Sequence, residues 1–263
     1  MPEGLRFVPK DCRRSQSVKI NILTIFPEMF SGVFSSSILG RAVQNGLLEI
    51  TCTDIRPFSQ SKHKNTDDYP FGGGAGMVMM AQPIMDAMAS VSASMPGARR
   101  IYLGPRGRRL STSLARSLAR ESGLILLCGH YEGVDQRALD SCVDEEISIG
   151  DYILTGGEIA AMVLTDCVSR FIPGVLGSEA SPEEESFSDG LLEYPQYTRP
   201  RVIRDLSVPD VLLSGDHAKI KAWRRAESLR ATARFRPDLL ETAQLSDRDR
   251  AVLKEMVSCS SES

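Results

Sequence analysis

The segment from Ile147 to Arg170 constrains the fold of this chain more than any other. It reads ISIGDYILTGGEIAAMVLTDCVSR, in which a short apolar run leads into a polar turn with two adjacent glycines, Gly156 and Gly157, before an apolar segment of helical character. Glycine lacks a Cβ atom, so backbone can approach a ligand closely, and the free N–H groups at a helix start favour an electron-rich group. The pattern predicts a strand–turn–helix unit whose turn is either an ordinary connection or one wall of a ligand site.

Strands alternate with helices from residue 18 to residue 177. Apolar runs predict strands at 18–26, 47–55, 99–103, 124–128 and 144–149, and helices are predicted at 38–45, 82–91, 111–121 and 135–142. This alternation favours an α/β fold with a parallel sheet and helices on both faces. Ligands bind such sheets beyond the carboxyl ends of the strands. Three polar, glycine-containing loops follow successive strands, and we expect them to converge on one binding site: GPRG (104–107), GHYEG (129–133) and GDYILTGG (150–157).

Charge is distributed unevenly in the last third of the chain. The net charge is −3, yet residues 178–195 hold six acidic residues and no lysine or arginine, whereas residues 217–236 hold seven basic residues and one acid. We interpret 178–195 as an acidic interdomain linker and 196–263 as a C-terminal domain with helices at 216–234 and 246–257. The basic helix favours a polyanion as its partner.

Several classes of protein are disfavoured. The six cysteines show no CxxC pair and no metal-ligand spacing, which fits a reducing cytoplasm better than a disulfide framework. No run approaches the roughly 18 apolar residues of a membrane span, and the N-terminus has no apolar signal core. Residues 1–17 are polar and aperiodic, so we expect a disordered leader, and Val18 is an alternative start.

Six motifs occur in order along the chain: FPEMF (26–30), DDYPFGGGAGMVM (67–79), CGHYEGVDQR (128–137), EISIGDYILTGGE (146–158), SRFIPGVLG (169–177) and HAKIKAWR (217–224). With them, residues 19 to about 240 resemble the bacterial tRNA (guanine-N1)-methyltransferases that modify guanosine 37, beside the anticodon. Six ordered blocks exclude a chance similarity.

The resemblance implies a SPOUT-type fold, in which the parallel sheet carries a deep trefoil knot. Residues 18–177 would form the knotted catalytic domain that binds S-adenosylmethionine, and 196–263 a small, mainly helical domain that binds tRNA. The resemblance also implies a cytoplasmic homodimer with the active site at the subunit interface, and assistance by Mg²⁺.

The resemblance further implies a cofactor-binding set drawn from the three glycine loops. Its members are Tyr102, Leu103, Gly104, Pro105, Gly129, Tyr131, Glu132, Ile149, Gly150, Tyr152, Leu154, Gly156 and Gly157. For Tyr131 and Tyr152 the alternative is plain packing. Glu132 is either a surface carboxylate or, between two glycine loops, a partner of the cofactor or of Mg²⁺.

Two further residues match catalytic positions of the family. The family's base is an aspartate in the connector that reaches the partner subunit's site, and the matching residue here is Glu185; its neighbours Glu183 and Glu184 would replace it if the register shifts. The alternative is a solvated run of charge. Arg170 matches an arginine that donates to guanine O6 as negative charge develops; the alternative is a cation that favours the C-terminus of a helix.

The remaining candidates concern the substrate. Asp67 and the triple glycine ending at Gly74 match a segment that closes around the guanine, although such a loop can also be mere flexibility. His217, Lys221, Arg224 and Arg225 are tRNA-contacting or core residues, and Trp223 is expected in the core. Phe235 departs from a pair of arginines usual in the family. Two other functions stay open: a related knotted methyltransferase acting on another RNA or on ribose, and a non-catalytic RNA-binding module.

Overall fold

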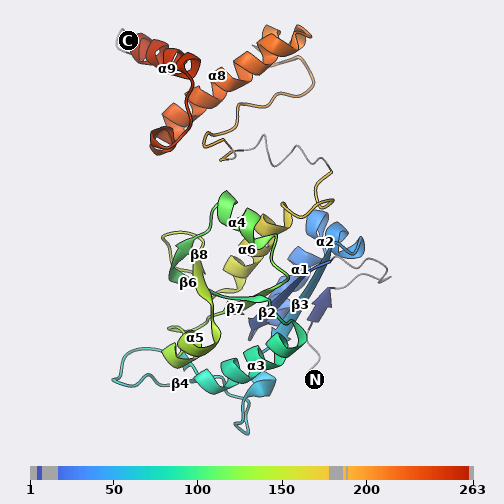
Figure 1. Ribbon diagram of the computed structural model, residues 1–263, viewed down its shortest axis with the longest axis vertical. Helices are drawn as coiled ribbons and strands as arrows, with labels where there is room; N and C mark the ends of the chain where they lie inside the picture. The colour runs from blue at the N-terminus through green and yellow to red at the C-terminus, as the bar shows by residue number, and fades with distance from the viewer. Residues whose placement is uncertain (1–4, 8–16, 178–185, 188, 261–263) are drawn as a thin grey trace. The chain divides into compact units, whose positions relative to one another are not determined.

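The computed structural model describes residues 5–7, 17–177, 186–187 and 189–260. The chain divides into two compact units, the first up to Ser178 and the second from Glu179, and each is described by itself (Figure 1).

A six-stranded sheet forms the centre of the first unit, in the order β1-β3-β2-β7-β6-β8. Its strands are β1 (Leu5–Phe7), β2 (Val18–Thr24), β3 (Leu48–Asp54), β6 (Arg99–Arg109), β7 (Leu124–Cys128) and β8 (Glu145–Ser148). Every neighbouring pair is parallel except β1 with β3. The predicted parallel sheet is therefore confirmed.

Helices cover both faces of this sheet (Figure 1). Alternation along β7 directs Leu124, Leu126 and Cys128 to one face and Ile125 and Leu127 to the other, and all five side chains are buried. The first face packs against α1 (Ser31–Phe34), α2 (Ser37–Gln44), α4 (Thr112–Leu118) and α6 (Glu158–Ser169), and the second against α3 (Ala81–Ser94) and α5 (Gln136–Cys142).

Short elements complete the first unit. Two 3₁₀ turns begin beside prolines, η1 (Pro27–Phe30) and η2 (Arg56–Phe58). The segment with the triple glycine ending at Gly74 connects β4 (Asp67–Asp68) to β5 (Val78–Met79), and these two strands form a two-stranded ladder. The stem of this segment is thereby ordered, which places Asp67 opposite Met79.

The expected disorder of residues 1–17 is wrong for Leu5–Phe7. These residues form β1, with Leu5 opposite Cys52 and Phe7 opposite Ile50. Without them β3 would be an edge strand with unpaired backbone groups, which favours strand addition. The Phe7 ring also packs edge-on against Phe34, 5.6 Å between centroids. Residues 1–4 and 8–16 of the predicted leader lie outside the described residues.

The strand predicted at 99–103 is also longer than expected. Ile147 pairs with Leu103 and again with Arg108, so β6 resumes its pairing with β8 after a register shift. The intervening GPRG segment is therefore an irregularity within β6 rather than a free loop. A side chain of β8 also holds this segment, because the Arg106 backbone N–H donates to Glu146 Oε1 at 3.0 Å.

The second unit is built on α8 (His217–Phe235) and α9 (Asp247–Ser260), which pack together. It also contains a hairpin of β9 (Val202–Ile203) with β10 (Leu206–Ser207) and two 3₁₀ turns, η3 (Asp210–Leu213) and η4 (Pro237–Glu241). The Asp216 carboxylate caps α8 by accepting the Lys219 N–H at 3.1 Å. Among the described helices, none has the length and apolar character that crossing a membrane requires.

A nearly buried ion pair joins α8 to α9. The Arg225 guanidinium donates from Nε to Asp249 Oδ1 at 3.2 Å and from Nη2 to Oδ2 at 3.0 Å, and the Ser246 N–H also donates to Asp249. Asp249 is 6% exposed. The hydrogen bonds from Arg225 lower the pKa of the Asp249 carboxyl from 3.8 to about 2.

This ion pair predicts acid sensitivity of the second unit. Because the pKa of Asp249 is lower in the folded state than in the unfolded state, its stabilising contribution is present above the unfolded value of about 4 and disappears as the pH falls to about 2. Asp249→Asn should lower the free energy of unfolding at neutral pH by about 2 kcal/mol and flatten its dependence on pH in this window. Trp223, the only tryptophan, lies in α8 and reports the transition by fluorescence. Unchanged melting of the variant at neutral pH would contradict the assignment.

Candidate functional site

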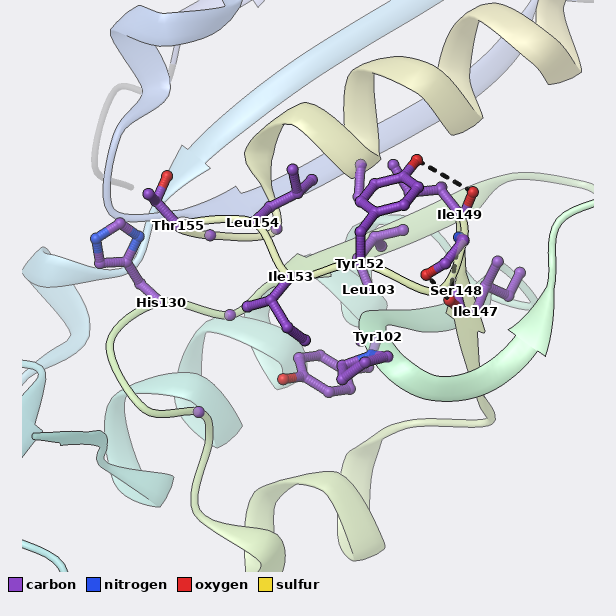
Figure 2. A pocket seen from close by; sticks show the side chains of 18 of the residues that line it. Tyr102, Leu103, His130, Ile147, Ser148, Ile149, Tyr152, Ile153, Leu154 and Thr155 are labelled. Carbon is purple, nitrogen blue, oxygen red and sulfur yellow. Dashed lines mark hydrogen bonds between the residues drawn. The ribbon is translucent and has the colours of Figure 1, made fainter. Parts of the chain in front are cut away.

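A cavity of about 250 Å³ lies beside the irregular middle of β6 and just beyond the ends of β7 and β8. Figure 2 shows side chains from β6, from the loop after β7, and from β8 and the segment after it gathered around the cavity. Every residue assigned from the sequence to the cofactor-binding set lines this one cavity: Tyr102, Leu103, Gly104, Pro105, Gly129, Tyr131, Glu132, Ile149, Gly150, Tyr152, Leu154, Gly156 and Gly157. The predicted convergence of the three glycine-containing segments is therefore confirmed.

Glycines allow the segments that line the cavity to pack closely against adjacent side chains and backbone. A Cβ atom at Gly129 would lie 2.8 Å from the Tyr102 hydroxyl oxygen, and one at Gly104 would lie 2.6 Å from the Tyr102 ring. A Cβ atom at Gly157 would lie 2.8 Å from Cys128 Cα and 2.9 Å from the Gly129 nitrogen. These approaches require glycine, because any larger residue would displace a ring or backbone.

The loop after β7 is held from two sides. The Gly157 N–H donates to the Gly129 carbonyl at 2.7 Å, and the Glu132 N–H donates to the Met77 carbonyl at 3.0 Å. Tyr131 has a φ of +58°, a left-handed conformation that costs free energy for a non-glycine residue and is common at ligand sites. The conformation of this loop is therefore set by hydrogen bonds to neighbouring segments rather than by the intrinsic backbone preferences of its residues.

Asp67, in β4, does not line the cavity but interacts with Tyr131, which does. Burial raises the pKa of the Tyr131 hydroxyl, and so do the charge of Asp67 and a hydrogen bond to it. Gly74, at the tip of the same loop, is exposed and does not line the cavity. The Glu132 side chain is exposed and lies over Gly76.

Nucleophilic catalysis by the nearest cysteine is disfavoured. Cys128 ends β7 beneath the cavity, and burial raises the pKa of its thiol well above the ordinary value of 9.0. The thiol therefore stays protonated and behaves as a small apolar group.

Sequence reasoning missed some of the cavity. Further lining residues are His130, Gly133, Ile147, Ser148, Ile153, Thr155 and Ala160. Glu158, the first residue of α6, lies buried close to Gly156 and His130. An acid in the first turn of a helix is an ordinary end signal, so the sequence contained nothing that separated Glu158 from a plain helix start.

Comparison with known proteins decides the family. A sequence profile described as tRNA (guanine-1)-methyltransferase TrmD matches residues 18–242. The chain belongs to this family. It is 56% identical to the tRNA (guanine-N(1)-)-methyltransferase of Geobacillus kaustophilus (strain HTA426), over 90% of this chain and 98% of that protein. It is 54% identical to the enzyme of that name from Alkaliphilus oremlandii (strain OhILAs), over 91% and 98%. The corresponding values for Geotalea uraniireducens (strain Rf4) are 55%, 91% and 97%.

Of the two residues predicted to be catalytic, the structure describes only Arg170, which is not among the residues that line the cavity. Arg170 is half-buried at the C-cap of α6, where its N–H donates to the Asp166 carbonyl at 3.3 Å. Glu185 lies outside the described residues, as do Glu183 and Glu184.

The candidate tRNA residues in the second unit differ in their surroundings. His217 and Lys221 are exposed on α8. Arg224 stacks over the Tyr194 ring at 4.7 Å, and Trp223 lies 6.2 Å from the Tyr197 ring. The Arg225 guanidinium is engaged with Asp249, which favours the core alternative for this residue.

The described residues do not provide a cluster of side chains that could hold a metal ion. Among residues 5–7, 17–177, 186–187 and 189–260, no three histidine, cysteine or acidic side chains converge. Mg²⁺ holds best to several oxygen ligands, so the expectation based on Glu132 stays a prediction, and no step proposed below uses the metal.

Proposed function

We propose that this chain methylates N1 of guanosine 37 in tRNA, with S-adenosylmethionine as the methyl donor. Membership of the family makes the chain a tRNA (guanine-N1)-methyltransferase. The donor and the position beside the anticodon are the finer parts of the proposal. The observation that supports the donor is the gathering of the whole predicted donor set around one cavity. The position beside the anticodon rests on membership of the family.

The donor would lie among the three glycine-containing segments. Backbone N–H and C=O groups can bind its polar edges, while Leu103, Ile149 and Leu154 cover its apolar surface. When bound, S-adenosylmethionine supplies a methyl group that its sulfonium already activates for transfer. The close glycine approaches support this fit, because they allow the segments that line the cavity to pack directly against one another.

Gly157→Ala should weaken donor binding without unfolding the protein. The added methyl group meets backbone atoms of Cys128 and Gly129, so the cavity wall has to move. Overpacking of this kind costs about 2 kcal/mol, which corresponds to roughly a 30-fold loss in donor affinity measured by calorimetry. Gly32→Ala is the matched control, because a Cβ atom there meets nothing within 4 Å. Equal affinity of Gly157→Ala and the parent would contradict the location of the donor site.

The remaining chemistry is proton removal and charge stabilisation. In the proposal, the Glu185 carboxylate accepts the proton from guanine N1. The Arg170 guanidinium donates to guanine O6, where negative charge accumulates as N1 loses its proton. The guanine must leave its stack to reach these groups, which a nucleotide in a loop does at low cost.

Two architectural features belong to the same proposal. The bonding of Gly157 to Gly129 and the bridge between Gly156 and His130 support a deep trefoil knot, because they place the start of α6 against the loop after β7.

Exposed apolar side chains at Ile153, Ile159 and Val163 support a homodimer, with Ile153 81% exposed. The base would then come from the partner's linker, with the active site at the subunit interface. A cytoplasmic location follows from the tRNA substrate.

Incubation with labelled donor and total tRNA tests the function. The expected product is 1-methylguanosine at position 37, detected by nuclease mapping and nucleoside analysis. A methylated ribose, or another RNA as the acceptor, would point to a related knotted methyltransferase. Binding of tRNA without methyl transfer would point to an RNA-binding module. Either result would overturn the proposal.

A further inference from the structure

A buried acid behind the cavity has no role in the proposed chemistry. Glu158 is 2% exposed, and its Oε1 accepts a hydrogen bond from Thr24 Oγ1 at 2.8 Å. Thr24, itself buried at the end of β2, accepts the Phe26 N–H at 2.9 Å. Burying a carboxylate costs free energy, which the helix N-terminus and one hydroxyl offset only in part. A second polar partner for the buried Glu158 carboxylate is therefore expected.

That partner is the imidazole of His130. Its Nδ1 lies 3.8 Å from Glu158 Oε2, and this nitrogen is buried and makes no hydrogen bond among the described residues. The ring is held edge-on between Phe26 and Tyr131, with centroids 4.9 and 5.0 Å away. His130 therefore cannot turn its Nδ1 elsewhere without disturbing two aromatic neighbours.

Gly156 keeps the space between these groups open. A Cβ atom at Gly156 would lie 2.5 Å from His130 Nδ1 and closer still to Glu158 Oε2. Backbone pairing between His130 and Gly156 holds the two segments in this register. The carboxylate and the imidazole thus face each other across a glycine, and His130 itself lines the cavity (Figure 2).

We propose that Glu158 is a positioning residue, which orients His130 and through it the donor-binding loop 129–132. A carboxylate opposite Nδ1 selects the tautomer that carries the hydrogen there and leaves Nε2 as an acceptor. This coupling ties the end of β2, the start of α6 and the loop after β7 into one rigid wall. The inference rests on the proposed function only in using donor affinity as one of its readouts.

A double-mutant cycle tests whether Glu158 acts through His130. Glu158→Gln and His130→Ala should each weaken donor binding to the full-length protein by about tenfold in calorimetry. If the two residues act as one unit, the double variant binds no more weakly than His130→Ala alone. Thr165→Val, another buried polar position on α6, is the control and should leave donor affinity unchanged. Independent losses that multiply in the double variant would overturn the inference.

A second readout needs no ligand. The chain has three histidines, and the ¹⁵N imidazole signals of His130 are those lost in His130→Ala. The parent should show the Nδ1–H tautomer, and Glu158→Gln should shift the population towards Nε2–H. An unchanged tautomer would overturn the inference even if the parent failed to bind the donor, a failure that would count against the proposed function alone. If Glu158→Gln does not fold, Thr24→Val removes the hydroxyl that holds the carboxylate and takes its place in both measurements.

Discussion

Glu185→Gln is expected to reduce the rate of methyl transfer by about 1,000-fold while donor affinity stays at its parental value. Glutamine keeps the shape of glutamate but cannot accept the proton of guanine N1, and loss of a general base costs about 10²- to 10⁴-fold. The rate is best measured in a single turnover with donor and tRNA saturating, because product release then does not mask the chemical step.

The neighbouring acids provide the control for this experiment. Glu184→Gln and Glu183→Gln remove the same charge from the same acidic run, so they separate a specific base from a general effect of charge. We expect both to keep a near-parental rate. A large loss in one of them, with Glu185→Gln active, would move the base by one or two positions; full activity of all three would remove the base from this segment.

Arg170→Ala is expected to lower the same single-turnover rate by about 100-fold and to weaken tRNA binding far less. A donor that stabilises charge only in the transition state contributes about 10²- to 10³-fold to the rate. Because Arg170 is half-buried at the end of α6, the effect of its loss on stability should also be checked by thermal melting.

Arg170→Lys is the informative companion. Lysine keeps the charge but lacks the planar guanidinium, so it should recover only part of the rate if directed hydrogen bonding to O6 matters. If the rate and the tRNA affinity fall by the same factor in Arg170→Ala, the residue contributes to binding rather than to catalysis.

Local patterns predicted most of the first unit. The predicted strand at 124–128 has the bounds of β7. The helix predicted from residue 111 begins as α4 at Thr112, where the Ser111 hydroxyl caps it by accepting the Leu114 N–H at 3.2 Å. Both predictions rest on properties of a few consecutive residues, namely an unbroken apolar run and a side chain that satisfies its own helix. The errors at Leu5–Phe7 and at the end of β6 have one cause, which is pairing with a distant strand. Leu5–Phe7 pairs with β3, and β6 extends to Arg109 because Arg108 and Arg109 pair with β8.

The candidate site divides in the same way. The glycine-containing segments stood out in the sequence, and the motifs assigned them to a donor site. The ion pair between Arg225 and Asp249 could not be predicted from the sequence, because the spacing of two charged residues 24 positions apart does not indicate a contact between them.

The amino-acid order by itself determined the alternation of strands and helices, the polar glycine turns at strand ends and the family, since each is a property of short stretches read one after another. Only the tertiary structure decided that Thr24 donates a hydrogen bond to Glu158, 134 positions away, and that His130 lies beside Glu158. The physical reason is that burial of a charge depends on which segments the sheet brings together, and that selection is made by packing over the whole unit.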